Sequence, residues 1–223
     1  NVEEHMQFQQ KALKITREKL SKDKSLIGFV GGFWTVMRFA IGQNKEQKQF
    51  QKFYPEYLEN TLYEALKINI KLQLDAGAEI VMMFDSGIQD LDNNFFQQEY
   101  TKLLTSIANL YPSKIGYYVR GKQFNDIKHL LELPFAGIGI DSSMNLKNLF
   151  TDFKQGFIQG NFDEKKLLLD TQNLTEELDK FSDNFNSFEN LNGWVCGLGH
   201  GINKNTPEKN VHLFIETIRK KFK

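Results

Sequence analysis

The stretch Ile-Val-Met-Met-Phe-Asp-Ser-Gly, residues 80–87, has the pattern that decides the fold class. Its first five residues are apolar without interruption, and polar residues and a glycine follow at once. A short continuous apolar run is typical of a strand that is buried on both faces of a parallel sheet. The polar residues after it then lie at the carboxyl end of the strand, where α/β proteins build their functional sites.

The same pattern recurs along the 223-residue chain. Six apolar runs have strand length: residues 26–30, 80–84, 115–119, 137–140, 157–160 and 194–198. The segments between them have the apolar spacing of amphipathic helices, and those with the clearest pattern are residues 3–21, 58–70, 174–185 and 206–222. Repeated alternation of strand and helix predicts the α/β class. Two architectures fit it, an open doubly wound sheet and a (β/α)₈ barrel, and six strands would leave a barrel two strands short at its N-terminus.

The last of these helices has the clearest start signal. Thr206 is a predicted N-cap, Pro207 takes the first helical position, and Glu208 favours the positive end of the helix. The predicted buried stripe of this helix consists of Val211, Phe214, Ile215, Ile218 and Phe222.

Composition excludes several classes of function. The 28 basic and 28 acidic residues give zero net charge, so there is no electrostatic reason to expect nucleic-acid binding. The single cysteine, Cys196, excludes an intramolecular disulfide and any multi-cysteine zinc site, and it is compatible with a reducing cytosol. No apolar run reaches the ~20 residues that span a bilayer. The chain begins with Asn1 rather than Met, so we expect further residues before it in the full gene product.

Two residues that follow predicted strands are the main candidates for a site. His200 lies between two glycines after the sixth run, where the backbone can approach a ligand, although a loop histidine can also simply satisfy nearby carbonyl groups. Ser86 follows the second run together with Asp85, and either side chain could instead cap a helix. The Gly197-x-Gly199-x-Gly201 cluster is not the dinucleotide-binding pattern, because no helix opens directly after it.

Structural roles are predicted for most other residues of chemical interest. We expect Asp90 and Asp92 to cap a helix near Asn94, Cys196 to be a small core residue, and Gly31-Gly32 to permit a tight turn. The 20 phenylalanines are expected mostly in the core. The remaining histidines are predicted to be surface or packing residues: His5, His129 and His212.

Four segments, taken together, resemble the uroporphyrinogen decarboxylase family over nearly the whole of residues 1–223. They are residues 26–35 (LIGFVGGFWT), similar to the family's IGF-x-G-x-PWT; residues 77–86 (GAEIVMMFDS), similar to GA-(D/E/Q)-…-FDS; residues 159–163 (QGNFD), similar to QGN-x-DP; and residues 197–211 (GLGHGINKNTPEKNV), similar to NLGHGI…TP-E-NV.

This resemblance implies a TIM-type (β/α)₈ barrel that forms a homodimer. It implies removal of CO₂ from the four acetate side chains of uroporphyrinogen to give coproporphyrinogen, in the cytoplasm, without a metal or organic cofactor. It further implies that Ser86 and His200 line the substrate cleft. We therefore expect one barrel-type domain over residues 1–223, lacking its first two βα units.

The chain also departs from the family pattern. Phe39 stands where the family has a tyrosine, so the ring is kept and the hydroxyl is lost. Arg38 takes a position that is commonly small or polar, Phe33 replaces the proline before the tryptophan, and Glu164 replaces the proline of QGN-x-DP. The family's arginine-rich R-Q-A-G-R segment and its catalytic aspartate, both N-terminal, have no counterpart, so we assign no catalytic residue to this chain. A fragment, a truncated product or a degenerate copy would each explain this.

Two rival functions remain open. One is a barrel of the corrinoid methyltransferase type, whose H-x-C…C zinc set cannot form with only Cys196. The other is a non-catalytic relative that binds a tetrapyrrole or another protein. We favour the decarboxylase for the full gene product, and weak or no activity for these 223 residues alone.

Overall fold

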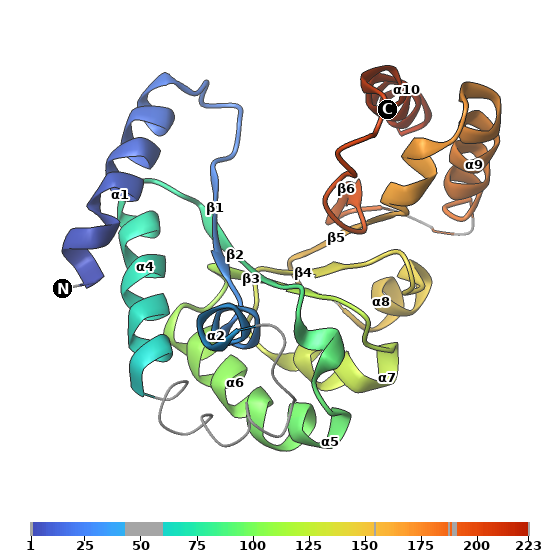
Figure 1. The fold of residues 1–223 in the computed structure, drawn as a ribbon. Helices are drawn as coiled ribbons and strands as arrows, with labels where there is room; N and C mark the ends of the chain where they lie inside the picture. Colours follow the sequence, from blue (N-terminus) through green and yellow to red (C-terminus); the bar gives the residue numbers. More distant parts are fainter. Residues whose placement is uncertain (1, 43–59, 154, 187, 189–190, 223) are drawn as a thin grey trace. The chain divides into compact units, whose positions relative to one another are not determined.

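The computed structural model describes residues 2–42, 60–153, 155–186, 188 and 191–222 (Figure 1). Its strands are β1 (Ile27–Gly31), β2 (Ile80–Asp85), β3 (Ile115–Val119), β4 (Gly137–Ile140), β5 (Phe157–Phe162) and β6 (Trp194–Leu198). Its α-helices are α1 (Val2–Lys19), α2 (Phe33–Ile41), α4 (Tyr63–Asp75), α5 (Asn93–Phe95), α6 (Thr101–Leu110), α7 (Phe124–Ile127), α8 (Leu146–Asp152), α9 (Thr171–Asp183) and α10 (Glu208–Lys221). Other short helices are η2 (Ile88–Asp90), η3 (Phe96–Tyr100), η4 (Lys128–Glu132) and η5 (Glu164–Leu168). None of the described helices is both long and apolar enough to cross a membrane.

The six strands form one sheet in the order β1-β2-β3-β4-β5-β6. The pairs β1–β2, β2–β3 and β5–β6 are parallel. A doubly wound sheet reverses its strand order at a switch point, whereas a barrel keeps the order of the chain. The predicted α/β class and barrel-type order are therefore confirmed, and the sheet is not closed within the described residues.

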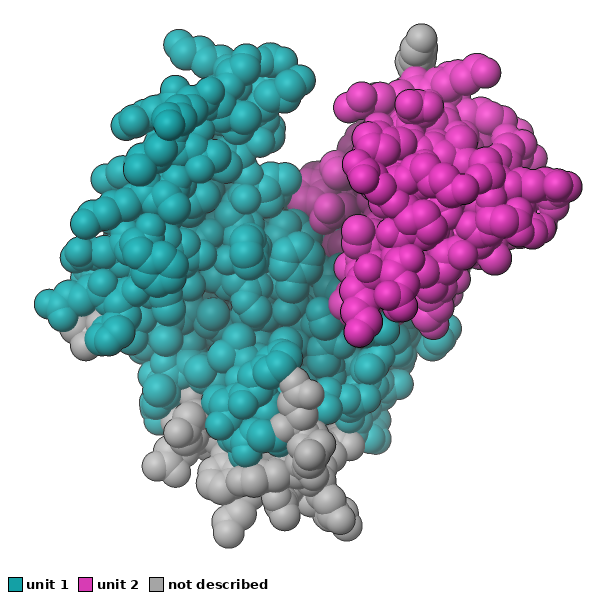
Figure 2. All heavy atoms as spheres, turned by 45° about the horizontal axis from the view of Figure 1, so that its top comes forward, with its two compact units in different colours: residues 1–138 teal, residues 139–223 magenta. Residues whose placement is uncertain are grey.

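The chain divides into two compact units, residues 1–138 and 139–223, which Figure 2 shows in different colours. The prediction of one barrel-type domain over residues 1–223 stays a prediction.

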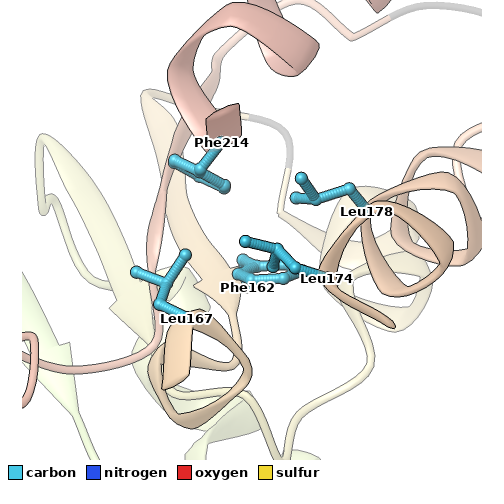
Figure 3. Packing of buried hydrophobic residues seen from close by; sticks show 5 residues of the cluster. All are labelled: Phe162, Leu167, Leu174, Leu178 and Phe214. Carbon is cyan, nitrogen blue, oxygen red and sulfur yellow. The ribbon is translucent and has the colours of Figure 1, made fainter. Parts of the chain in front are cut away.

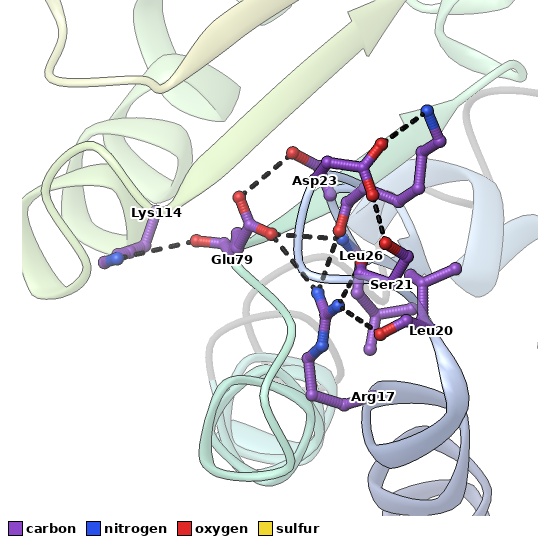
Figure 4. A network of polar contacts seen from close by, with 9 residues as sticks. Arg17, Leu20, Ser21, Asp23, Leu26, Glu79 and Lys114 are labelled. Carbon is purple, nitrogen blue, oxygen red and sulfur yellow. Dashed lines mark hydrogen bonds and ion pairs between the residues drawn. The ribbon is translucent and has the colours of Figure 1, made fainter.

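In unit 1, helix α4 packs on β1 and β2, and α1 packs on α4 (Figure 1). The predicted apolar face of α4 is confirmed at Leu66 and Ile70, which are buried, whereas Leu58 lies outside the described residues. A polar network ends α1: the Arg17 guanidinium donates to the carbonyl oxygens of Leu20 at 3.0 Å and Ser21 at 2.9 Å (Figure 4). Glu79 faces Arg17 at 3.6 Å, so the ion pair links the end of α1 to the start of β2.

One side chain of α4 forms hydrogen bonds with the main chain at the outer edge of β1. Gln73 accepts a hydrogen bond from the backbone N–H of Phe29 and donates one to the Phe29 carbonyl oxygen, both at 2.9 Å. It also donates to Asn69 Oδ1 at 3.0 Å, which orients the amide. Gly28 makes this approach possible, because a Cβ there would lie 2.3 Å from Gln73 Oε1. The amide thus takes the place of a neighbouring strand at an edge that would otherwise invite pairing.

Unit 2 has its own apolar core between β5, η5, α9 and α10 (Figure 3). Its buried members are Phe162, Leu167, Leu174, Leu178 and Phe214. The helical stripe predicted around Leu174 and Leu178 is confirmed by their burial.

The start and the stripe predicted for the last helix need correction. Pro207 has an extended ψ of 131° and is the N-cap, so α10 begins at Glu208 and Thr206 lies one residue outside it. Ile215 is 39% exposed, whereas Asn210 is buried and donates to the carbonyl oxygens of Leu167 at 2.9 Å and Leu169 at 2.8 Å. These two hydrogen bonds hold Asn210 inward, and the buried face of α10 therefore runs through Asn210 and Phe214 rather than through Ile215.

Candidate functional site

A buried carboxylate ends β2. Asp85 is fully buried, and its Oδ1 accepts from the backbone N–H of Thr35 at 3.0 Å and from Thr35 Oγ1 at 2.7 Å. Its Oδ2 accepts from the hydroxyls of Tyr100 and of Tyr117, the latter at 3.1 Å. Burial raises the pKa of Asp85, while these donors act in the opposite direction. Asp85 therefore caps the first turn of α2 from a different element, which confirms a capping role for this residue.

Gly32 lets the capping carboxylate approach the helix. A Cβ at Gly32 would lie 2.3 Å from Asp85 Cγ, closer than any side chain could tolerate. Its φ of −65° is open to every residue, so the glycine is required by the close approach and not by the turn that the sequence predicts.

The loop that carries Ser86 is fixed on both sides. Asp85 holds Thr35, and Thr35 Oγ1 in turn accepts from the backbone N–H of Gly87 at 2.9 Å. Ser86 itself lies between these anchors and is half-buried. Hydrogen bonds therefore hold the residues on both sides of Ser86, as a substrate-positioning residue requires.

The two aspartates after this loop have different partners. Asp92 caps α5 by accepting from the backbone N–H of Phe95 at 3.1 Å, as predicted. Asp90 is not a cap: it forms an ion pair with Arg38 of α2, a long-range partner that no local pattern indicates.

Several phenylalanine side chains of unit 1 are exposed, although the sequence predicts a mostly buried set. Phe29 of β1 is 62% exposed and Phe84 of β2 is 37% exposed, and their rings meet edge-on with centroids 6.3 Å apart. The Phe84 ring also lies 5.7 Å from that of Tyr118 on β3. Phe39 on α2 is 66% exposed. Exposed and buried residues alternate along β1, a pattern that its apolar sequence Ile-Gly-Phe-Val-Gly does not indicate.

The loop with His200 lies in unit 2. The backbone N–H of Gly199 donates to the Phe162 carbonyl oxygen at 2.7 Å, directly after β6. A Cβ at Gly199 would lie 2.5 Å from the backbone nitrogen of Ser142, so the loop packs tightly on the segment after β4. His200 is half-buried and not helical, as expected for a residue between two glycines.

Asn161 braces the same end of unit 2. It lies near the end of β5 and is 8% exposed. Its amide donates to the carbonyl oxygens of Asp141 at 2.9 Å and Met144 at 2.6 Å, which ties β5 to the loop after β4. Asn161 of the QGN segment therefore has a structural role: it holds the loop after β4, on which the His200 loop packs.

A polar cavity of about 660 Å³ also lies in unit 2, between the loop after β4, the end of β5 and α9. Glu177 on its wall pairs with Lys166 and with Lys180, the latter at 2.7 Å. Hydrogen bonds from these lysines lower the pKa of Glu177 to about 2. His200 is not among the described residues that line the cavity.

The remaining candidates have packing roles. Cys196 is half-buried against the core of unit 2, and burial raises the pKa of its thiol to about 12, which disfavours the thiolate. His129 lies 2.8 Å from Thr101 Oγ1 and its ring meets that of Phe96 edge-on. His212 is exposed and faces Glu208 at 3.5 Å. These placements agree with the predicted surface and packing roles.

The family model for uroporphyrinogen decarboxylase (URO-D) matches residues 1–221. The chain belongs to the uroporphyrinogen decarboxylase family. Among curated relatives, the uroporphyrinogen decarboxylase of Orientia tsutsugamushi (strain Ikeda) is 30% identical over 224 residues, with 93% of this chain and 64% of the relative covered. That of Campylobacter fetus subsp. fetus is 29% identical over 222 residues, with 94% and 63% covered. The chain thus spans a little less than two thirds of the length of these members of the family.

Solved structures support the fold alone. A putative vitamin-B12-independent methionine synthase from Listeria monocytogenes matches with a TM-score of 0.63 at 15% identity, covering 95% of this chain and 68% of that one. A B12-independent methionine synthase from Shewanella sp. W3-18-1 matches with a TM-score of 0.62 at 10% identity, covering 94% and 64%.

Ser86 and Phe39 belong to unit 1 and His200 belongs to unit 2. That they bind one substrate stays a prediction. Sequence patterns did not indicate Thr35, Tyr100 and Tyr117 as the groups that fix the Ser86 loop, because these residues lie 15 to 50 positions away from Asp85.

Proposed function

We propose that this chain supplies the substrate-binding residues Ser86 and His200 of a uroporphyrinogen decarboxylase. Membership of the family over residues 1–221 supports the substrate class. The observation that carries the proposal is the anchored Asp85-Ser86-Gly87 loop, which holds a hydroxyl at the carboxyl end of β2. His200 follows the carboxyl end of β6, the corresponding place on another strand of the sheet.

The proposed reaction removes CO₂ from each acetate side chain of uroporphyrinogen and leaves coproporphyrinogen. A pyrrole ring is first protonated, and its iminium form accepts the electron pair that remains when the carbon–carboxylate bond breaks. The methylene carbon left behind then takes up a proton to become a methyl group, and the ring loses the proton that it first gained. A site for this reaction has to hold several carboxylates and stabilise a cationic ring. No metal or organic cofactor is required by this scheme.

Each residue has a definite part in the proposed site. The Ser86 hydroxyl donates to a substrate carboxylate, and His200 hydrogen-bonds a carboxylate or a pyrrole edge. Phe39 packs on the macrocycle without the hydrogen bond that a tyrosine would add. The exposed rings of Phe29 and Phe84 extend the apolar surface available to the pyrroles.

We also propose that the 223 residues alone are weakly active or inactive, and that the full gene product is a cytoplasmic homodimer. The support for weak activity is chemical: no carboxylate in the printed sequence matches the family's catalytic aspartate, so the pyrrole cation lacks its counter-charge. The homodimer and the compartment rest on the family resemblance.

The test is to incubate uroporphyrinogen anaerobically with the chain and with the full gene product, and to separate the products by carboxylate number. Products with seven, six, five and four carboxylates support the decarboxylase. In the full product we expect Ser86→Ala and His200→Ala to lower kcat/KM by about 10-fold or more, since a hydrogen bond to a charged group contributes about 1.5–3 kcal/mol. His212→Ala, at an exposed histidine, is the matched control. Unchanged kcat/KM in both site variants would overturn the assignment.

A second candidate is a relative that binds a tetrapyrrole or another protein without converting it, and it is favoured by the lack of a counterpart in residues 1–223 to the family's catalytic aspartate and arginine-rich segment. Binding of uroporphyrin by the full gene product with no CO₂ release from uroporphyrinogen would support that role. The methyltransferase alternative is not supported, because its zinc set requires more than one thiol and the chain has only Cys196.

A further inference from the structure

A guanidinium group lies beside the loop that carries Ser86. Arg38 of α2 donates from Nη1 to the carbonyl oxygen of Gly87 at 3.5 Å and forms an ion pair with Asp90 through the same nitrogen. A Cβ at Gly87 would lie 3.3 Å from Nη1, so the cation is in contact with the residue next to Ser86. Arg38, Gly87 and Asp90 all belong to unit 1.

The guanidinium is only partly used by these contacts. It carries five N–H donors in a planar fork that matches the two oxygens of a carboxylate. Within the part of the chain that the structure describes, Nη1 makes both side-chain hydrogen bonds of Arg38, and Nε and Nη2 make none. The side chain is 22% exposed, so part of it is open to a ligand.

The present partner of Arg38 is easily exchanged. Asp90 is 50% exposed, so water screens its attraction to the guanidinium and the ion pair is weak. A ligand carboxylate that binds the guanidinium in bidentate fashion would form a stronger contact than this pair. Asp90 meanwhile neutralises Arg38 and keeps it beside Gly87 while no ligand is bound.

We propose that Arg38 binds a carboxylate of the substrate next to Ser86, and that Asp90 competes with that carboxylate for the guanidinium. This inference rests on the proposed function, which supplies a ligand with several carboxylates. It gives a binding role to a residue at a position where the family commonly has a small or polar side chain.

The experiment measures the affinity of the full gene product for uroporphyrin by fluorescence titration, with wild type, Arg38→Gln and Asp90→Asn. If Arg38 binds a carboxylate, Arg38→Gln weakens binding about 10-fold, whereas Asp90→Asn strengthens it about 3-fold because the competitor is gone. If the pair only holds the loop in place, both variants weaken binding alike, and the inference is overturned. Unchanged affinity in Arg38→Gln also overturns it.

Two further arms complete the design. Arg38→Lys keeps the charge but loses the fork, so it should bind more weakly than wild type, and it retains the test if Arg38→Gln does not fold. Coproporphyrin has propionate but no acetate groups: an equal loss with both porphyrins assigns the contact to a propionate, and a loss with uroporphyrin alone assigns it to an acetate. Wild type that binds neither porphyrin contradicts the proposed function itself, a result distinct from failure of the Arg38 contact.

Discussion

Replacement of Gln73 by leucine tests how the outer edge of β1 is stabilised. The Gln73 amide makes two hydrogen bonds of 2.9 Å with the main chain of Phe29 and is 1% exposed. Leucine has a similar volume, so the variant removes both of these hydrogen bonds, and the one to Asn69, without opening a large cavity. The N–H and C=O of Phe29 then lose the partner that takes the place of a neighbouring strand.

The expected cost follows from these two bonds. Each contributes about 1 kcal/mol net, and an unpaired main-chain group cut off from water adds to that cost. Burial of the leucine side chain offsets part of it, so we expect the free energy of unfolding to fall by about 2–3 kcal/mol. Urea denaturation followed by circular dichroism measures this change, with an unchanged m-value as a check that the compactness of both states is kept.

The matched control is Gln172→Leu, at an exposed glutamine of α9, where we expect a change within about 0.5 kcal/mol. Hydrogen exchange adds a local measurement, since the Phe29 amide should lose its protection in Gln73→Leu alone. A Gln73 variant that costs no more than the control, with the Phe29 amide still protected, would refute the argument.

Three other predictions concern the core, the pH dependence and the site. Leu178→Ala should lower the free energy of unfolding by about 2–5 kcal/mol because it opens a cavity in the core of unit 2. Leu168 is 43% exposed, so Leu168→Ala should lower it far less, and denaturant titration of both variants measures the difference. The pKa of Glu177 falls from 4.5 to about 2 on folding, so the stability that this ionised carboxylate contributes is present above pH 4.5 and is lost as the pH falls toward 2. The difference in Tm between wild type and Glu177→Gln should therefore shrink over that range, and a constant difference would contradict this prediction. Phe39→Tyr adds a hydroxyl at a 66% exposed position, so uroporphyrin affinity should rise about 3- to 10-fold with little change in Tm, and equal affinity would place residue 39 away from the ligand.

Local patterns were sufficient to predict the strands. Continuous apolar runs identified all six within about two residues, since burial on both faces leaves a composition that is visible along the chain. The Asp92 cap and the apolar face of α9 were also predicted correctly. A cap and a helical stripe depend on neighbours only three or four residues away, so their signal is local in the sequence.

Long-range contacts account for what the sequence did not indicate. The partners of Asp85 come from α2, η3 and β3, and Arg38 meets Asp90 from a different element. The start of α10 was missed by one residue because Pro207 can either cap a helix or open it. Phe29 looks like a core residue by type, and only its place on β1 shows that its ring is exposed.

The most direct test of the proposed substrate site is a crystal structure of the full gene product with coproporphyrinogen bound. We predict that Ser86 Oγ and a ring nitrogen of His200 each lie within about 3.2 Å of the same ligand molecule. A ligand bound elsewhere, or one in contact with neither side chain, would contradict the account.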